Sequence, residues 1–306
     1  MSDRHLIVGA GPVGTQLAAL LAARGSEVVV ATRSGTDTGV AGVRHERVDA
    51  SDAEALSRLA EGADVLYNCA NPTDYTQWAI VWPPLAASLL TAAERTGAVL
   101  AITGNLYPYG PVEGPMVESL PDAATDAKGR LRARMWADAR DAHVAGRLRA
   151  VEVRGSDYVG PGVGANGHIS RVLPKAMKGR RAWVIGSPDL PHTFTDVLDM
   201  GRALVAAAAD ETAHGQVWHA PSNPAITQRQ ALTDVLAAAG RPKVAVSGIP
   251  TAAMALTARF SGMVRELREL SYQWTRPYVL DDAVSREKLG LEPTPWDEVC
   301  ARAARV

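Results

Sequence analysis

Cysteine is scarce in this chain, with only Cys69 and Cys300 among 306 residues. So few thiols argue against a disulfide framework or a cysteine-rich zinc site and favour a reducing compartment. No uninterrupted apolar stretch approaches the roughly 18 residues that indicate a membrane-spanning helix. The amino terminus enters an apolar run at once, which leaves no room for a secretory signal. We therefore expect a cytoplasmic protein that contacts no membrane and binds no metal.

An excess of charge of either sign is also missing. The chain has 32 Lys and Arg residues against 33 Asp and Glu residues, a formal net charge of -1 and a pI near 6.7. Nucleic-acid-binding proteins carry a basic footprint that this composition lacks, so a small-molecule substrate is the expected partner. At roughly 100–200 residues per domain, the length predicts one large domain or two closely associated ones.

A glycine-rich turn is the most informative feature that the sequence does contain. Gly9, Gly11 and Gly14 form a G-x-G-x-x-G motif that follows a short apolar run and opens a helix through Pro12 and Val13. The first glycine permits a tight turn, the second lets the backbone approach a diphosphate, and the third lets the helix pack on the strand. The strand before the motif and the helix after it favour dinucleotide binding over a ligand-free glycine turn.

The first half of the chain alternates predicted strands and helices. Strands are expected at residues 27–33, 63–70, 98–105 and 148–156, and helices at 51–61, 83–97 and 126–146. This rhythm predicts an α/β fold, a Rossmann-type doubly wound parallel sheet with a smaller, mainly C-terminal substrate lobe. We expect residues 1–160 to form the dinucleotide-binding domain, with 193–220 returning to its sheet. Residues 161–192 and 221–306 are expected to form the lobe, whose helical tail includes 228–240, 252–270 and 281–289.

Several segments together resemble the extended short-chain dehydrogenase/reductases, in an atypical branch similar to NAD-dependent epimerase/dehydratases. Besides the glycine motif, residues 154–162 end in Gly-Pro-Gly, 192–197 read His-Thr-Phe-Thr-Asp-Val, and the tail carries matching segments at 280–282 and 286–293. The resemblance places Gly155 and Ser156 beside the nicotinamide, and it implies a homodimer by analogy. It also implies that small residues after the fourth strand, Cys69, Ala70 and Asn71, lie along the cofactor. Cys69 is expected to pack as a small hydrophobe rather than act as a nucleophile.

The cofactor is predicted from the end of the second strand. NAD-specific relatives place a carboxylate there, whereas this chain has Thr32 and Arg33, and a guanidinium suits the 2′-phosphate of NADP(H). We therefore expect NADP(H) in preference to NAD(H), although Arg33 can also be read as a solvated turn residue. Asp49 and Ala50 follow the third strand and are expected along the adenine. For Asp49 an equal alternative is that it caps the next helix.

The catalytic pattern of the resembled family is incomplete. Its members usually carry an upstream Ser and a Tyr-x-x-x-Lys, and here Asn105 occupies the Ser position while no Tyr-x-x-x-Lys occurs between residues 127 and 134. If the strand end stays extended, Asn105 and Tyr107 face the nicotinamide together. Tyr107 is then the favoured proton donor, with a wall of the substrate pocket as its alternative. Lys128 is a second candidate, for the ribose or for proton supply, or else an exposed helix residue.

Further polar and aromatic residues are candidates for substrate contacts. Asp157 can contact substrate or stabilise a turn, and His168 and His192 are secondary acid–base candidates or packed histidines. Trp274 belongs to an aromatic segment, 272–278, that fits either a pocket wall or core packing. The leading hypothesis is an NADPH-dependent reductase of a carbonyl or related group on a small apolar metabolite. The alternatives are a cofactor-retaining epimerase or dehydratase and a non-catalytic NADP(H)-binding sensor.

Overall fold

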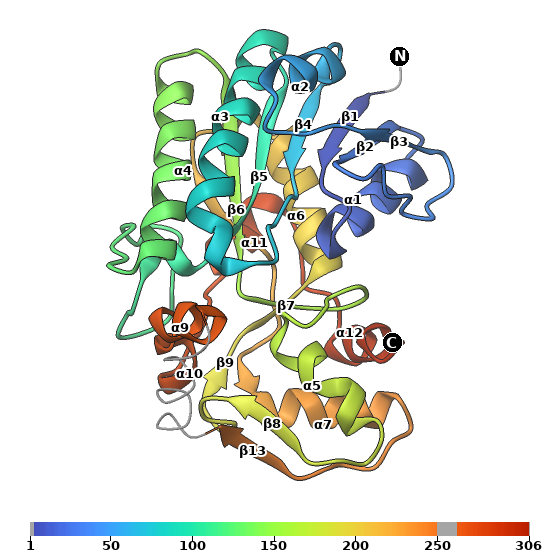
Figure 1. Cartoon of the computed structure of the whole chain (residues 1–306), viewed down its shortest axis with the longest axis vertical. Helices are drawn as coiled ribbons and strands as arrows, with labels where there is room; N and C mark the ends of the chain where they lie inside the picture. Colours follow the sequence, from blue (N-terminus) through green and yellow to red (C-terminus); the bar gives the residue numbers. More distant parts are fainter. Residues whose placement is uncertain (1–2, 250–261, 306) are drawn as a thin grey trace.

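A seven-stranded parallel sheet organises the computed structural model, which describes residues 3–249 and 262–305 (Figure 1). The strand order is β11-β6-β5-β4-β1-β2-β3. These strands comprise β1 (Arg4–Val8), β2 (Glu27–Thr32), β3 (Val43–Arg47), β4 (Val65–Asn68), β5 (Val99–Asn105), β6 (Arg149–Gly155) and β11 (Val217–His219). Because the order reverses beside β1, the carboxyl ends of β1 and β4 flank a crevice where such sheets bind ligands. The predicted doubly wound fold is confirmed.

Helices cover both faces of the sheet. One face carries α1 (Pro12–Ala23), α6 (Val197–Ala209) and α11 (Ala283–Leu289), and the other carries α2 (Ala53–Ala60), α3 (Trp78–Thr96) and α4 (Ala127–Val144). Side chains alternate along β1, so that Ile7 belongs to the first core while Leu6 and Val8 belong to the second. Apolar residues on both faces of every central strand explain why these strands read as continuous hydrophobic runs.

Two predicted helix starts differ from the structure. Helix α3 begins at Trp78 rather than at the proline pair, so Pro83 and Pro84 lie inside it and leave carbonyls of the preceding turn without their usual partners. Burial of Trp78 and Trp82 in the sheet core holds this first turn in place. Helix α2 begins at Ala53 rather than at residue 51. Its cap is Asp52, whose carboxylate accepts from two backbone N–H groups, so Asp49 is not the cap.

The smaller lobe lies beyond the carboxyl ends of the strands (Figure 1). Its elements are β7 (Asp157–Val159), α5 (His168–Ala176), β8 (Ala182–Ile185), β9 (Pro191–His192), β10 (Phe194–Asp196), β12 (Ile226–Thr227), α7 (Gln228–Ala238), β13 (Val246–Ile249), α9 (Gly262–Glu269), α10 (Tyr272–Thr275) and α12 (Trp296–Ala303). The core of the lobe joins α5, α7 and α12 to the parallel pair β8–β13. Short 3-10 helices occupy Tyr75–Gln77 (η1), Tyr107–Tyr109 (η2) and Glu211–Ala213 (η3).

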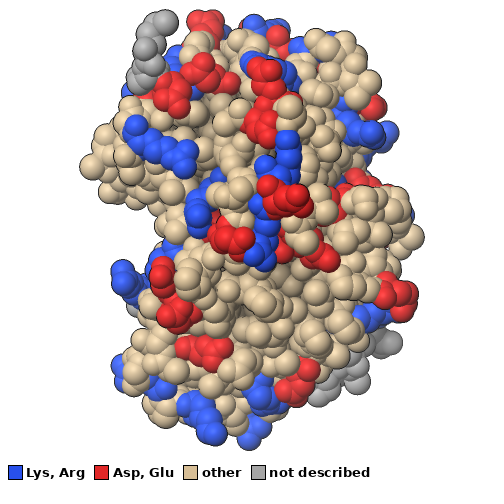
Figure 2. All heavy atoms as spheres, turned by 180° about the vertical axis from the view of Figure 1, so that it is seen from behind, with Lys and Arg blue, Asp and Glu red and all other residues tan. Residues whose placement is uncertain are grey.

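The C-terminal tail departs from the expected division. Helix α11, expected in the lobe, packs instead on α6 and β11 of the sheet domain. The helix expected over residues 252–270 falls partly outside the described residues, and the described portion contains α9. Across residues 3–249 and 262–305, none of the helices has the length and apolar character needed to span a bilayer. On the face seen in Figure 2, basic and acidic side chains are interspersed.

Candidate active site

The glycine turn after β1 has the geometry of a diphosphate cradle. Gly9 has a φ of 110°, and a Cβ there would lie 2.7 Å from the Cys69 carbonyl oxygen. A Cβ on Gly14 would lie 2.0 Å from the Gly9 carbonyl oxygen, whereas one on Gly11 would meet nothing within 4 Å. No side chain caps the start of α1, where Pro12 is the first residue. Free N–H groups next to open space fit an anionic diphosphate, so the residues present suit a dinucleotide.

A cavity of about 620 Å³ opens along the carboxyl ends of the strands. Its wall brings together most of the residues that the sequence marks as site residues. Those lining it are Gly9, Gly11, Pro12, Val13, Thr32, Arg33, Asp49, Ala50, Cys69, Ala70, Asn71, Asn105, Tyr107, Gly155, Ser156 and Asp157. Five others do not line it, namely Gly14, Lys128, His168, His192 and Trp274.

One end of the cavity lies over β2 and β3. Arg33 is exposed there, and Asp49 accepts hydrogen bonds from the Ser51 N–H at 3.0 Å and from the Ser51 hydroxyl at 2.7 Å. These bonds, with a smaller contribution from the Arg33 charge, hold the pKa of Asp49 below its ordinary value. Asp49 is therefore ionised and close to a cation. At the base of the cavity, burial raises the pKa of Cys69 to about 12, so this side chain stays an inert thiol.

The opposite end is built from phenols. Strand β5 ends at Asn105, as expected, but Leu106 turns into the right-handed helical region, so the chain does not stay extended as far as Tyr107. Asn105 instead accepts from the Tyr107 N–H at 3.1 Å, and the Tyr107 and Tyr75 hydroxyls lie 3.1 Å apart. Asn105 and Tyr107 still share the cavity wall. Burial raises the pKa of Tyr107 well above 10, so its hydroxyl keeps its proton and can donate it.

Lys128 lies away from the cavity, contrary to its expected place at the ribose. Its buried ammonium contacts Glu266, and Glu269 at 3.2 Å, both on α9. One helical turn further along α4, Arg132 lines the cavity, donates to the Thr103 carbonyl at 2.7 Å and stacks over Trp82. Sequence reasoning missed Arg132, although its spacing from Lys128 places both on one helix face.

Tyr158 is another cavity residue that sequence reasoning missed. Its hydroxyl donates to the Gly104 carbonyl at 2.8 Å, and its ring limits the space next to Gly155. The neighbouring Ser156 is fixed through its N–H, which donates to the Thr195 hydroxyl at 2.9 Å. Tyr158 lies within residues 154–162, the segment that the family resemblance places beside the nicotinamide. Its place in that segment was the signal by which the sequence could have identified it.

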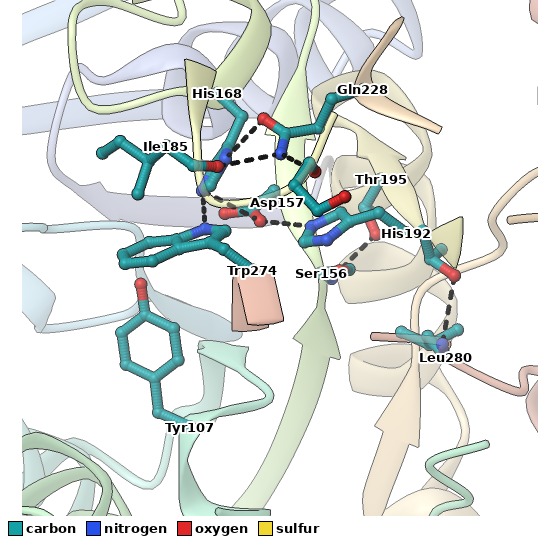
Figure 3. A network of polar contacts seen from close by, with 12 residues as sticks. Tyr107, Ser156, Asp157, His168, Ile185, His192, Thr195, Gln228, Trp274 and Leu280 are labelled. Atoms are coloured by element: carbon teal, nitrogen blue, oxygen red, sulfur yellow. Dashed lines mark hydrogen bonds and ion pairs between the residues drawn. The ribbon is translucent and has the colours of Figure 1, made fainter. Parts of the chain in front are cut away.

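The remaining candidates form one buried network behind the cavity (Figure 3). Asp157 lies between His168 and His192, and its Oδ2 is 2.5 Å from His192 Nε2. Burial alone would raise the pKa of Asp157, but its interactions with His168 and His192, including the hydrogen bond with His192, and the charge of Arg171 together outweigh burial, and the pKa is lowered. Trp274 donates from its indole nitrogen to His168 Nε2 at 2.7 Å. Of this group, only Asp157 reaches the cavity wall.

The tautomer of His168 follows from its partners. Burial lowers its pKa to about 4, so the ring is neutral, and Trp274 requires Nε2 to be the acceptor. Nδ1 then carries the proton and donates to the Gln228 side-chain oxygen at 3.3 Å. Nε2 is also 3.3 Å from Asp157 Oδ2, but two acceptors form no hydrogen bond. The hydrogen-bond partner of Asp157 is therefore His192.

Comparisons with known proteins agree with this geometry. The model of the NAD dependent epimerase/dehydratase family matches residues 5–220. A search of curated proteins finds no match.

Solved structures resemble nearly the whole chain. The dTDP-glucose 4,6-dehydratase from Bacillus anthracis, in complex with NAD, is 14% identical, with a TM-score of 0.79 over 99% of this chain and 96% of that one. The UDP-glucose 4-epimerase from Brucella ovis, also with NAD, is 20% identical, with a TM-score of 0.76 over 99% and 98%. The UDP-glucose 4-epimerase from Thermotoga maritima, with UDP-glucose, is 16% identical, with a TM-score of 0.79 over 98% and 97%.

At these identities the solved structures establish the fold alone. The family model spans more than half of the residues and therefore establishes family membership. The chain belongs to the NAD dependent epimerase/dehydratase family.

Proposed function

We propose that this protein binds a nicotinamide dinucleotide in the cavity and transfers hydride between it and a carbon–oxygen centre of a small substrate. The observation that carries the proposal is the continuity of one cavity wall. It runs from the uncapped start of α1 to the hydroxyls of Tyr75 and Tyr107. Such a reaction requires two things of the protein, N–H donors for the diphosphate and a proton donor for the substrate, and this wall carries both.

The side chains have separate tasks in this proposal. A bound nicotinamide supplies or accepts the hydride. In the reductive direction, the Tyr107 hydroxyl gives its proton to the substrate oxygen as the carbonyl becomes an alcohol. Tyr75, 3.1 Å away, lines the same cavity and passes a replacement proton from water. Asn105, which is fixed by the Tyr107 N–H, orients the substrate oxygen. In the oxidative direction the same atoms act in reverse.

We further propose that NADP(H) is preferred to NAD(H). Arg33 lines the cavity at the end of β2, and it makes no hydrogen bond or ion pair within the described residues. The strand offers no carboxylate at this point for the ribose hydroxyls. A free guanidinium suits a 2′-phosphate, because it can donate two parallel hydrogen bonds to the phosphate oxygens.

Two forms of the reaction are candidates. Family membership and the dehydratases and epimerases of similar fold favour a cycle in which the substrate is oxidised and reduced again while the cofactor is retained. Net reduction of a carbonyl is favoured by the protonated phenols and by the apolar wall that Trp78, Ile80 and Leu85 contribute. Dinucleotide binding without any turnover would support the sensor hypothesis instead.

Two assays separate these forms. Net reduction consumes NADPH with a member of a carbonyl panel, as followed by nicotinamide absorbance. A retained-cofactor cycle leaves the nicotinamide absorbance unchanged. Its assay supplies UDP-glucose or dTDP-glucose deuterated at the reacting carbon, and the expected result is a deuterium-labelled product that has been epimerised or dehydrated.

In either assay we expect Tyr107→Phe to lower kcat about 100-fold, because it removes the proton donor. Tyr67→Phe, which alters a buried core tyrosine outside the cavity, is the matched control and keeps full activity. Undiminished kcat in Tyr107→Phe would remove this residue from the reaction.

A further inference from the structure

Two cavity-lining side chains from the C-terminal segment have no hydrogen-bond partner within residues 3–249 and 262–305. Gln273 is 1% exposed, and neither its Nε2 nor its Oε1 is bonded. Tyr278 is 3% exposed, and its hydroxyl is equally unbonded. Both residues line the cavity. Buried amides and phenols are almost always paired, so two unpaired ones on the same cavity wall indicate a ligand that pairs them.

The buried histidines position these two side chains. Trp274, the neighbour of Gln273, is tied to His168 by its indole N–H (Figure 3). The Tyr278 ring packs on His192 with centroids 5.3 Å apart, and its N–H donates to the Pro191 carbonyl at 2.9 Å. The segment is thus anchored at both ends to α5 and β9. His168 and His192 are therefore positioning residues. They do not line the cavity themselves, but they hold the segment whose Gln273 and Tyr278 do.

Asp157 adds an anionic acceptor on the wall of the same cavity, and its charge acts on Tyr278. Both of its imidazole contacts use Oδ2, while Oδ1 makes no hydrogen bond or ion pair among the described residues. Arg171, on α5, acts on Asp157 electrostatically without forming an ion pair with it, and one of its guanidinium nitrogens is unpaired. The charges of Asp157 and Arg171 offset each other at this point, which favours an uncharged ligand here. Arg132, a further cation on the cavity wall, donates to the Thr103 carbonyl.

We propose that Gln273, Tyr278 and Asp157 form a subsite for an uncharged group that carries an N–H or O–H donor next to a carbonyl acceptor, such as the edge of a cyclic amide. A carboxamide offers one donor and one acceptor side by side, so it pairs with such an edge through two parallel hydrogen bonds. The rings of Tyr75 and Trp78 line the same cavity and cover the apolar body of the ligand. The subsite rests on the proposed function, since it holds the non-reacting part of the hydride-transfer substrate.

The test uses δ-valerolactam as probe, with N-methyl-δ-valerolactam, which lacks the N–H, and pentanoate, which is an anion. Dissociation constants are measured by ligand-observed NMR on the full chain with and without NADPH. We expect the lactam to bind roughly tenfold more tightly than its N-methyl form, the effect of one hydrogen bond, and pentanoate to bind more weakly than the lactam.

Variants locate the effect. Gln273→Leu should abolish the preference for the lactam, and Tyr278→Phe should weaken lactam binding severalfold. Tyr272→Phe is the matched control, because this neighbouring tyrosine does not line the cavity, and it should behave as wild type. Unchanged NADPH affinity in each variant shows that it is folded.

Equal affinity for the two lactams in the wild type, or a preference that survives Gln273→Leu, overturns the subsite. Tighter binding of pentanoate than of lactam also overturns it. The two proposals fail separately. Lactam discrimination without binding of either NADPH or NADH supports the subsite and refutes the proposed function, whereas dinucleotide binding without lactam discrimination refutes the subsite alone.

Discussion

Arg33 is the residue whose charge distinguishes NADP(H) from NAD(H) in our proposal. Arg33→Ala is expected to weaken NADPH binding by about 10- to 100-fold, because hydrogen bonds between charged groups contribute roughly 1.5–3 kcal/mol. NADH has no 2′-phosphate, so its affinity should change little. Titration of both dinucleotides at one low ionic strength measures the difference.

Arg47 provides the control for charge alone. It lies at the end of the adjacent strand β3, is exposed, and does not line the cavity. Arg47→Ala should leave both affinities nearly unchanged. Equal losses for NADPH and NADH in Arg33→Ala would contradict a phosphate role for Arg33.

The residues that sequence reasoning identified are those whose chemistry is local. Gly9 is required by the positive φ of its turn and Gly14 by the nearby Gly9 carbonyl, so the spacing of glycines suffices to predict them. Arg132 and Gln273 escaped prediction because their importance lies in missing partners, and only the folded chain shows which polar atoms are unpaired. Lys128 was misplaced because its carboxylate partners on α9 are more than 130 positions away in sequence.

At the scale of elements, strands and helices followed from hydrophobic pattern, but their ends did not. Burial on both faces makes β1, β2, β4, β5 and β6 recognisable as apolar runs. Asp126 caps α4 in the structure, at the start of the helix expected over residues 126–146. The start of α3 depends on where two tryptophans are buried, and tertiary packing of this kind overrides the usual position of proline in the first helical turn. The end of β5 depends likewise on a 3-10 turn that no local signal marks.

The contact between α4 and α9 depends on one buried cation. Lys128 is 3% exposed and touches two carboxylates, Glu266 and Glu269, that are partly exposed. Lys128→Met keeps the apolar stem and leaves these carboxylates without their partner. Breaking a buried pair costs about 3–5 kcal/mol, and because the carboxylates retain some solvent we expect about 2 kcal/mol here. Urea unfolding measures this free energy.

Lys178→Met, at an exposed position without an ion pair among the described residues, should cost little by comparison. The same pair of variants also tests the ribose role expected from sequence. A loss of NADPH affinity in Lys128→Met without any loss of stability would support the ribose role. It would contradict a stabilising contact between Lys128 and the carboxylates of α9.

At the scale of the whole molecule, the cavity joins the sheet domain to the lobe. Asn166, at the lobe side, donates to the Thr73 carbonyl at 3.2 Å, and Gly162 approaches Pro12 at the start of α1. Gln273 and Tyr278 close the same cavity from the C-terminal segment. A dinucleotide bound along the strands and a substrate held by the lobe therefore share one space, so each part contributes to a single site.

Buried histidines in both parts make the stability of the molecule depend on pH. Burial lowers the pKa of His168, in the lobe, and of His219, at the sheet edge, to about 4, whereas an unfolded imidazole titrates near 6.5. Between those values the unfolded chain takes up protons that the folded chain does not. The free energy of unfolding must therefore fall as pH is lowered from about 6.5, by up to about 1.4 kcal/mol per pH unit for each group.

Urea unfolding between about pH 7 and 5.5 measures this slope, since most carboxyl groups stay ionised across that range. His168→Gln and His219→Gln should each reduce the slope by removing one titrating group. His45→Gln changes a half-buried histidine on β3 and is the matched control. A slope that both substitutions leave at its wild-type value would show that these two imidazoles do not resist protonation in the folded protein, and the neutral His168 that accepts from Trp274 would then be wrong.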